Sequence, residues 1–283
     1  MKIQGNTYPI EGDIKITSFS KTLAFVKRDL IINLSYKLNF FSHYVNILFI
    51  VVVLYFVSQI FAGSQAVSSI ANDYFSFVLV GVALLGYLNT SLNSFSQAFR
   101  MAQVSGTLEY MLVTPTRVSQ IVFSSGMYNF IITSLDILIY LVIGSVLFYL
   151  DLARMNILSF SLILLLTIVT FSSLGIIDAA FVILFRKGGV LSQFVTILFS
   201  LFGGVFYPAE VLPPAMATVS RYIPITYSLE AARLSLFRGY SVAMLLPQIL
   251  MLCLFAILML PASILAFNAA VKIVKKTGSL TQY

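Results

Sequence analysis

Long stretches of apolar residues without a charged side chain dominate the pattern of this chain. They cover residues 38–72, 74–99, 155–177, 188–209 and 239–271. A helix that crosses a lipid bilayer needs about 20 mostly apolar residues, because each residue adds about 1.5 Å to its length. A membrane β-barrel would instead show alternating segments of about ten residues. The pattern therefore predicts an all-α integral membrane protein.

Six transmembrane helices are expected from these stretches. We place them near residues 44–62, 75–95, 119–149, 156–185, 190–207 and 243–270. The third and fourth are long enough to tilt or to project beyond the bilayer, and no turn signal divides either into two crossings. Residues 151–156 are expected to form the hairpin between them, and Pro208 with the next two prolines is expected to end the fifth.

The segment before the first expected span has the pattern of an amphipathic helix over residues 21–41. Its apolar residues recur at spacings of three and four, and they are Leu23, Val26, Leu30, Leu34, Leu38 and Phe41. We expect this helix to lie in the membrane surface, with an extension of the first span as the alternative. The expected organisation is a cytoplasmic N-terminus with an interfacial helix (1–43), a transmembrane domain (44–271) and a cytoplasmic tail (272–283).

Composition and charge add an orientation. Hydrophobic residues make up 59% of the chain and charged residues 10%, whereas soluble domains average about 25% charged residues. The net charge of +7 comes from Lys and Arg that flank apolar stretches, so nucleic-acid binding is set aside. Only four of the 17 basic residues fall in segments expected outside, namely Arg154, Arg221, Arg233 and Arg238. The positive-inside rule predicts a multi-pass plasma-membrane protein with both termini in the cytoplasm.

The sequence offers little for catalysis. It contains one cysteine, Cys253, and one histidine, His43, so one copy cannot form a disulfide, a Cys/His nucleophile pair or a metal cluster of such residues. No G-x-x-x-x-G-K-[ST] phosphate loop occurs, and no soluble stretch is long enough for a nucleotide-binding domain. We expect no catalytic residue, no metal site and no bound cofactor, and any coupled ATP hydrolysis is expected on another polypeptide.

The segment between Arg100 and Arg117 is the first informative loop. Its pattern favours a short helix, because Gly106 can cap its start, Glu109 lies in the first turn and Pro115 disfavours helix before it. A rigid helix between two spans can transmit a push from a cytoplasmic partner into both of them. A plain surface turn is an equally open interpretation.

Residues 203–239 form the second informative segment, on the expected outer side. They are too apolar for a solvated loop, yet their prolines exclude one spanning helix. Short helices that dip back into the outer leaflet fit best, shielded by protein or by a water-filled cavity. We expect this segment to cap a pathway or an interface, and its marked residues are Tyr207, Pro208, Glu210, Pro213, Pro214 and Pro224.

These two segments carry a resemblance to a known family. The run Gly106–Pro115 is similar to the cytoplasmic coupling segment of type-2 ABC transporter permeases, whose usual form is close to G-T-L-E-x-L-L-x-T-P, and the stretch Gly204–Tyr227 resembles that family's external re-entrant segment. The two stand about 90 residues apart and three expected spans separate them. The resemblance covers nearly the whole chain and is closest to the drug and small-lipophile export branch. The N-terminal basic motif typical of O-antigen and teichoic-acid permeases is not evident.

The resemblance implies a permease subunit of an ATP-driven exporter. Its cargo would be a lipophilic drug-like, lipid or glycan-type molecule that leaves the cytoplasm by alternating access. Two permease copies, expected as a homodimer among membrane lipids, or two related permeases, would join two cytoplasmic ABC ATPase subunits that bind ATP and Mg. The residues that would couple this chain to the ATPase are Gly106, Thr107, Leu108, Glu109, Tyr110 and Pro115.

Polar stripes suggest where a translocation pathway could lie. Asn89, Asn93 and Gln97 share one face of the second expected span, and Gln193, Thr196 and Ser200 mark a face of the fifth. By the resemblance, these two spans line the central cavity. The alternative is that these side chains hold helices together, as small and polar residues commonly do in membranes.

Two acids lie within apolar spans, Asp136 and Asp178. A lone carboxylate is costly there and is therefore paired, protonated or facing water. A helix-packing function is preferred over a proton relay, because no intramembrane Lys or Arg stands opposite. The relay defines a second function class, an ion-coupled secondary transporter or channel that uses both acids. A membrane enzyme is disfavoured, because the single His43 leaves no convincing pair of nucleophile and base.

Overall fold

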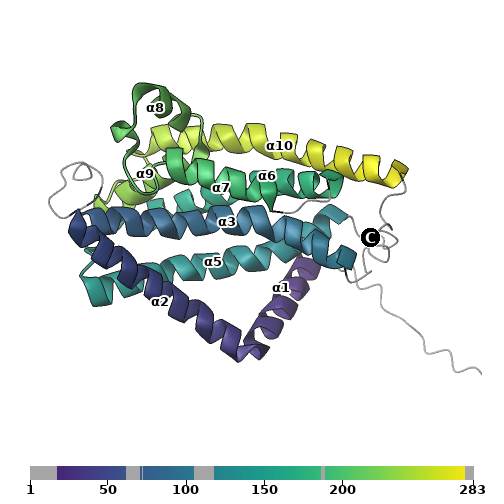
Figure 1. Cartoon of the computed structure of the whole chain (residues 1–283), viewed down its shortest axis with the longest axis horizontal. Helices are drawn as coiled ribbons and strands as arrows, with labels where there is room; N and C mark the ends of the chain where they lie inside the picture. The colour runs from purple at the N-terminus through teal and green to yellow at the C-terminus, as the bar shows by residue number, and fades with distance from the viewer. Residues whose placement is uncertain (1–17, 62–70, 72, 105–117, 186–188, 278–283) are drawn as a thin grey trace, which may run out of the picture.

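The computed structural model describes residues 18–61, 71, 73–104, 118–185 and 189–277, and these residues form helices and no strand (Figure 1). In chain order the elements are α1 (Ser18–Ser35), α2 (Lys37–Ile60), α3 (Tyr74–Val104), α5 (Val118–Phe148), α6 (Ile157–Phe185), α7 (Val190–Phe202), the 3-10 helix η2 (Ala209–Val211), α8 (Pro214–Ser220), α9 (Pro224–Phe237) and α10 (Leu246–Thr277). Helices α3, α5, α6 and α10 run side by side, and α8 and α9 lie at the end opposite the C-terminal end of α10.

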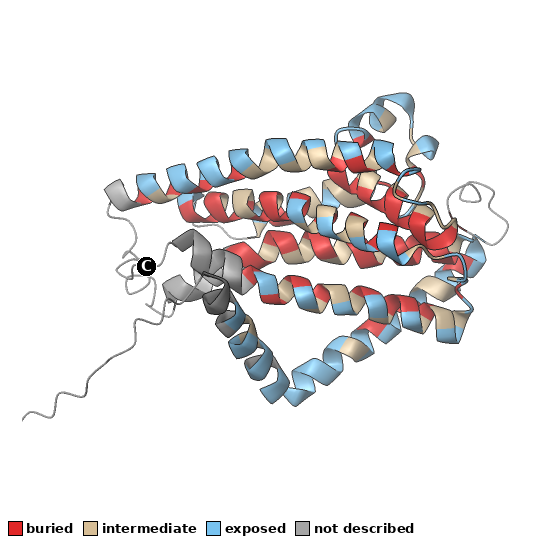
Figure 2. Ribbon diagram, turned by 180° about the vertical axis from the view of Figure 1, so that it is seen from behind, coloured by how far each residue is buried: buried red, intermediate tan, exposed pale blue. Residues whose placement is uncertain are grey.

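Five of the described helices are long and apolar enough to cross a membrane, namely α2, α3, α5, α6 and α10. Figure 2 shows exposed residues along the outward faces of α2 and α10, and many of these residues are large and apolar. Phe49 and Phe56 of α2 are each 65% exposed, and Ile257 of α10 is 70% exposed. Apolar faces of this extent are costly in water and favourable in lipid. The predicted all-α membrane architecture is confirmed.

The expected fifth span differs from the prediction. Helix α7 has 13 residues and ends at Phe202, whereas the sequence predicted a helix as far as residue 207. Such a helix is about 20 Å long, which is less than the roughly 30 Å of a bilayer core. Gly203 and Gly204 end it before the prolines do, and Gly204 has the positive φ of 79° that glycine adopts without strain. A count of six crossings therefore stays a prediction.

Other helix ends lie outside the charge-free stretches. Helix α2 begins at Lys37 instead of residue 44, α3 continues to Val104, and α10 continues to Thr277, beyond the predicted start of the tail at residue 272. A backbone helix needs no apolar side chains beyond the bilayer, so helices extend past the window that hydropathy marks. The hairpin expected at residues 151–156 is confirmed, because residues 149–156 connect α5 and α6 without helix.

The predicted amphipathic helix of residues 21–41 is broken at Tyr36. Helix α1 ends at Ser35, and residues 37–41 belong to α2. Neither proline nor glycine occurs near the break, so the sequence pattern does not predict it. The Ser35 hydroxyl donates to the carbonyl of Ile31, 2.8 Å away, a local bond that commonly bends helices. Helix α1 packs against α5, while α2 packs against both α3 and α5 (Figure 1).

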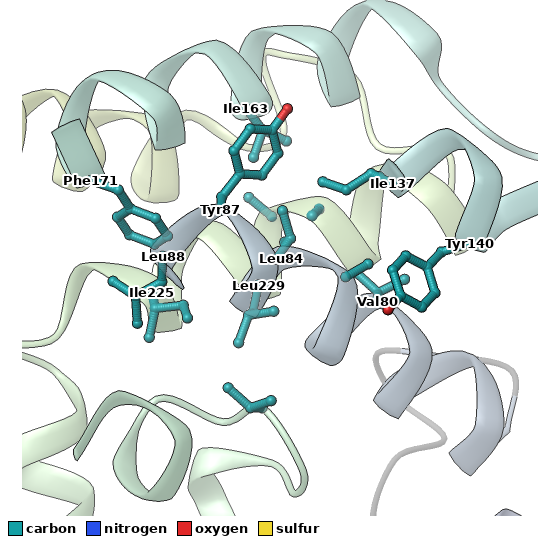
Figure 3. Packing of buried hydrophobic residues seen from close by; sticks show 14 of the residues in the cluster. Val80, Leu84, Tyr87, Leu88, Ile137, Tyr140, Ile163, Phe171, Ile225 and Leu229 are labelled. Atoms are coloured by element: carbon teal, nitrogen blue, oxygen red, sulfur yellow. The ribbon is translucent and has the colours of Figure 1, made fainter. Parts of the chain in front are cut away.

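Helix α3 is the centre of the bundle. It contacts α2, α5, α6, α7 and α9, and most of its side chains between Tyr74 and Phe95 are buried. Figure 3 shows Leu84, Tyr87 and Leu88 of α3 among the packed core residues. The Tyr87 hydroxyl lies 2.5 Å from that of Ser134 in α5, so the large buried ring also satisfies its polar tip.

A missing side chain lets α6 approach α3. A Cβ atom at Gly175 of α6 would stand 2.0 Å from the carbonyl oxygen of Ser91 in α3, closer than any side chain tolerates. In lipid, helices associate largely through such close contacts between small residues. Gly175 therefore explains why these two backbones can pack together.

Residues 203–239, which we call the outer segment after its predicted side, fold as predicted into short helices separated by prolines. Pro214 begins α8 and Pro224 begins α9, where the missing amide hydrogen of proline is tolerated. Helix α9 is largely buried and packs against α6 and α10. The Gln248 amide of α10 donates to the Glu230 carboxylate of α9 over 3.0 Å. Whether this segment dips into the outer leaflet stays a prediction.

Arg233 of α9 ties the outer segment to the bundle. Arg233 is one of the four basic residues expected outside, but only 3% of its surface is exposed. Its guanidinium donates to the carbonyl of Phe77 in α3 (2.9 and 3.1 Å) and to those of Gly204 (2.9 Å) and Val205 (3.1 Å) after α7. It also lies 3.4 Å from the centre of the Phe77 ring.

The absence of a side chain at Gly81 and the positive charge of Arg233 both favour this packing of α9 against α3. A Cβ atom at Gly81 would stand 2.2 Å from the Val205 oxygen and 2.9 Å from Arg233, so only glycine leaves room there. Burial lowers the pKa of Arg233 to about 9, and the negative charge of Glu210 acts in the opposite direction. The guanidinium therefore stays charged at neutral pH, and its hydrogen bonds to the three carbonyls offset the cost of removing it from water.

We predict that Arg233→Ala lowers the free energy of unfolding by about 2–4 kcal/mol, because it removes charge-assisted hydrogen bonds and leaves buried carbonyls without their donor. Arg233→Lys should restore only part of this, since an ammonium cannot reproduce the planar fork. Thermal unfolding in detergent can be followed by circular dichroism, because the described residues are mostly helical. The exposed Arg221 provides the control, and an Arg233→Ala protein as stable as Arg221→Ala would contradict the prediction.

Candidate functional site

The structure brings the two predicted polar stripes together. The Thr196 hydroxyl of α7 donates to the side-chain oxygen of Asn89 in α3 over 2.9 Å. The Asn93 amide donates to the Asn89 carbonyl, and the Ser200 hydroxyl donates to the Thr196 carbonyl. Gln193 is exposed, and the side chain of Gln97 lies outside the described residues. Helices α3 and α7 thus meet through polar groups, which both the pathway and the packing interpretations require.

The predicted coupling segment lies outside the described residues, which include none of Gly106, Thr107, Leu108, Glu109, Tyr110 and Pro115. Its two flanking helices are described. Helix α3 ends at Val104 and α5 begins at Val118, and the two pack against each other. These ends lie at the same end of the bundle as the C-terminal end of α10 (Figure 1).

Asp136 of α5 has a partner that the sequence reasoning missed. The Nε2 atom of His43 in α2 lies 3.0 Å from Asp136 Oδ1. The sequence shows no intramembrane Lys or Arg to pair with this acid, and the structure supplies an imidazole instead. The signal that could have revealed the pair is that His43 is the one titratable side chain besides tyrosine in the first apolar stretch.

The His43–Asp136 pair borders a polar cavity between α2, α3 and α5. The cavity has a volume of about 270 Å³ and is lined by His43, Thr90, Asn93, Ser94, Asn129, Ile132, Thr133 and Asp136. The Thr133 hydroxyl donates to the carbonyl of Asn129, and the Asn129 amide donates to the Ser94 hydroxyl. Asn129 and Thr133 thus share the face of Asp136, as their spacing predicts.

Asp178 is separate from this cavity. It is fully buried in α6, one turn after Gly175, and is not among the residues that line the space around Asp136. The two acids therefore do not face one described cavity, which an ion pathway through both would need.

Most of the outer-segment residues singled out from the sequence hold the local fold, through hydrogen bonds or by position at helix starts. The Tyr207 hydroxyl donates to the Leu201 carbonyl of α7, and the Tyr74 hydroxyl of α3 donates to the Phe206 carbonyl over 3.0 Å. Pro208 precedes η2, Pro213 precedes α8, and Glu210 is exposed within η2. Within the described part of the chain, no three His, Cys, Asp or Glu residues are grouped so that they could hold a metal ion.

Comparison with known proteins agrees with this architecture. A family model described as ABC-2 type transporter matches residues 21–237. Two similar proteins, both named inner membrane transport permease YadH, come from Escherichia coli strain K12 and from Shigella flexneri. Each is 26% identical over 187 residues, which cover 65% of this chain and 72% of the relative.

The family match begins within α1 and extends to the end of α9. It therefore includes the central helix α3, the predicted coupling segment at residues 106–115 and nearly all of the outer segment. Its extent and the membrane-spanning helices lead to one conclusion: the chain belongs to the ABC-2 type transporter family.

Proposed function

We propose that this chain is the membrane-spanning permease subunit of an ATP-driven exporter that moves a lipophilic molecule out of the cytoplasm by alternating access. One observation supports this above the others: the family match is continuous over residues 21–237, so it includes both the predicted coupling segment and the outer segment. The relatives are named as inner membrane transport permeases, which is consistent with a multi-pass protein of the plasma membrane.

The working assembly would contain two copies of this chain and two cytoplasmic ABC ATPase subunits. ATP and Mg would bind to the ATPase, and this chain would act without a cofactor or catalytic residue of its own. Both termini would lie in the cytoplasm, on the side of the ATPase. Membrane lipid would surround the exposed apolar faces of α2, α5, α6 and α10.

Helix α3 is well suited to carry motion from one membrane face to the other. Its 31 residues span roughly 45 Å, from Tyr74 beneath the outer segment to Val104 beside the coupling segment. At its outer end the Phe77 carbonyl accepts hydrogen bonds from Arg233. A push on residues 105–117 would thus reach α9 through one rigid helix, and α7 would follow through the bond between Asn89 and Thr196.

The ion-coupled alternative has less support. The family contains transport permeases, and Asp136 is paired with His43 instead of standing alone in an apolar span. Asp178 lies away from the cavity that Asp136 lines.

We predict that Glu109→Gln and Leu108→Ala reduce substrate-stimulated ATP hydrolysis of the complex with its ABC ATPase at least about fivefold, the lower end of typical coupling between two sites. Copurification of the ATPase measures whether the complex still assembles. Asp151→Asn is a matched control, because Asp151 is an exposed acid just beyond the opposite end of α5. Unchanged stimulation in both coupling variants would count against the proposed function.

The contact between Asn89 and Thr196 allows a test of the pathway. A double-mutant cycle with Asn89→Ala and Thr196→Val should give a coupling energy of about 0.5–1.5 kcal/mol, as found for hydrogen bonds between membrane helices. If these residues also line the pathway, Thr196→Val should in addition change the apparent KM for transport.

The same substitution at Thr170 provides the control for this test. Thr170 is a buried residue of α6 whose hydroxyl reaches the Leu252 carbonyl of α10, 3.4 Å away and on another interface. Its replacement should reduce stability without changing KM. If Thr196→Val also reduces stability without changing KM, Thr196 packs helices together and does not line the pathway.

A further inference from the structure

The cavity between α2, α3 and α5 is unusual for its position, because polar groups line it although the surrounding helices are apolar. Its volume of about 270 Å³ has room for several water molecules or one small head group. It is smaller than the roughly 300–1,000 Å³ of sites that enclose a whole drug-sized ligand. A ligand would therefore insert only its polar end here.

Two hydroxyl groups at the cavity are left with oxygen lone pairs only. The Thr133 hydroxyl donates its one hydrogen to the Asn129 carbonyl, so the contact of 2.8 Å between Thr90 and Thr133 must use the hydrogen of Thr90. The Asn129 amide donates one of its two hydrogens to the Ser94 hydroxyl. The oxygens of Thr90 and Thr133 can therefore only accept from a ligand, which favours a group that carries positive charge.

The charges around the cavity point the same way. Among the described residues that line the cavity, Asp136 is the one acid and none is Lys or Arg. An anion would meet this carboxylate without a strong cation to balance it. A cation would gain a counter-ion in an environment where unpaired charge is costly. The described partner of Asp136 is the imidazole of His43, whose side chain is about half exposed.

The side chain of His43 is 47% exposed, whereas that of Asp136 is 14% exposed. We therefore infer that a ligand enters the cavity past His43. The Tyr44 ring meets His43 edge to face with centroids 5.2 Å apart, and Phe40 meets Tyr44 in the same way at 4.8 Å. The Tyr44 and Phe40 rings do not line the cavity, but they lie beside His43, and the faces of aromatic rings attract cations.

Depth in the membrane also fits an amphiphile. His43 lies six residues after Lys37, which begins α2, so it stands about 9 Å further along the helix axis. A lysine at a helix end reaches the head-group layer. This entry would then face the region just beneath the head groups, and exposed apolar residues such as Ile131 and Leu135 of α5 offer a surface for an alkyl tail.

From these observations we propose that this cavity binds the ammonium head group of a cationic amphiphile, with Asp136 as counter-ion and with the ammonium replacing His43 at the carboxylate. The inference depends on the proposed function only in regarding this amphiphile as cargo. Binding itself requires neither ATP nor the ATPase, so the site can fail while the permease assignment stands.

The single histidine provides a direct measurement. The chain, purified in dodecyl maltoside through an affinity tag without histidine and labelled with ¹⁵N-histidine, gives ring signals from His43 alone. Decyltrimethylammonium should move these signals in a saturable way as the imidazole leaves Asp136. Two control ligands with the same tail should not move the signals. One is the neutral isostere with a tert-butyl end group, and the other is the anion decyl sulfate.

Variants and a lipid arm complete the test. Asp136→Asn should weaken the response at least about tenfold, because it removes the full negative charge, while Asp151→Asn should leave it unchanged. The comparison of ligands on the unaltered chain holds even if Asp136→Asn fails to fold. Equal responses to the cation and its neutral isostere, or no saturable response, would overturn the proposal. A response to phosphatidylcholine and none to the free cation would also overturn it.

Discussion

The hydrogen bonds of Arg233 are the interaction on which the packing of α9 against the end of α7 and against α3 depends. Where α7 ends at Gly203 and Gly204, the backbone leaves its helix and its carbonyls need donors from elsewhere. In a membrane such groups must be satisfied within the protein. Arg233 supplies donors to the carbonyls of Gly204 and Val205, and a further pair to Phe77 of α3. One side chain therefore joins α9, the end of α7 and the central helix.

Most of the fold could be predicted from hydropathy, because a lipid environment demands long apolar helices. The limits of the helices could not. Hydropathy marks where a helix meets lipid and does not mark where its backbone ends, so α3 and α10 run past their predicted limits. Local backbone chemistry decided other ends: the glycine pair shortened α7, and the break at Tyr36 carries no breaker residue that a sequence pattern would reveal.

The candidate sites were predictable where helical periodicity controls them. Spacing placed Asn89 and Thr196 on faces of α3 and α7, and the structure joins them. Pairing between distant residues was not predictable, because 93 residues separate His43 from Asp136. Arg233 had a signal that was overlooked: it shares a helix face with Leu229, Leu236 and Phe237, all buried, which marks it as a buried cation instead of a surface charge.

We propose that this chain is a membrane gate driven by a separate ATPase. The most direct measurement is uptake of a fluorescent lipophilic cation into inside-out proteoliposomes that contain this chain with or without the proposed ABC ATPase. We expect accumulation only when the ATPase, ATP and Mg are all present, and no effect of collapsing the proton gradient. Accumulation by this chain alone, or uptake that follows an ion gradient without ATP, would contradict it.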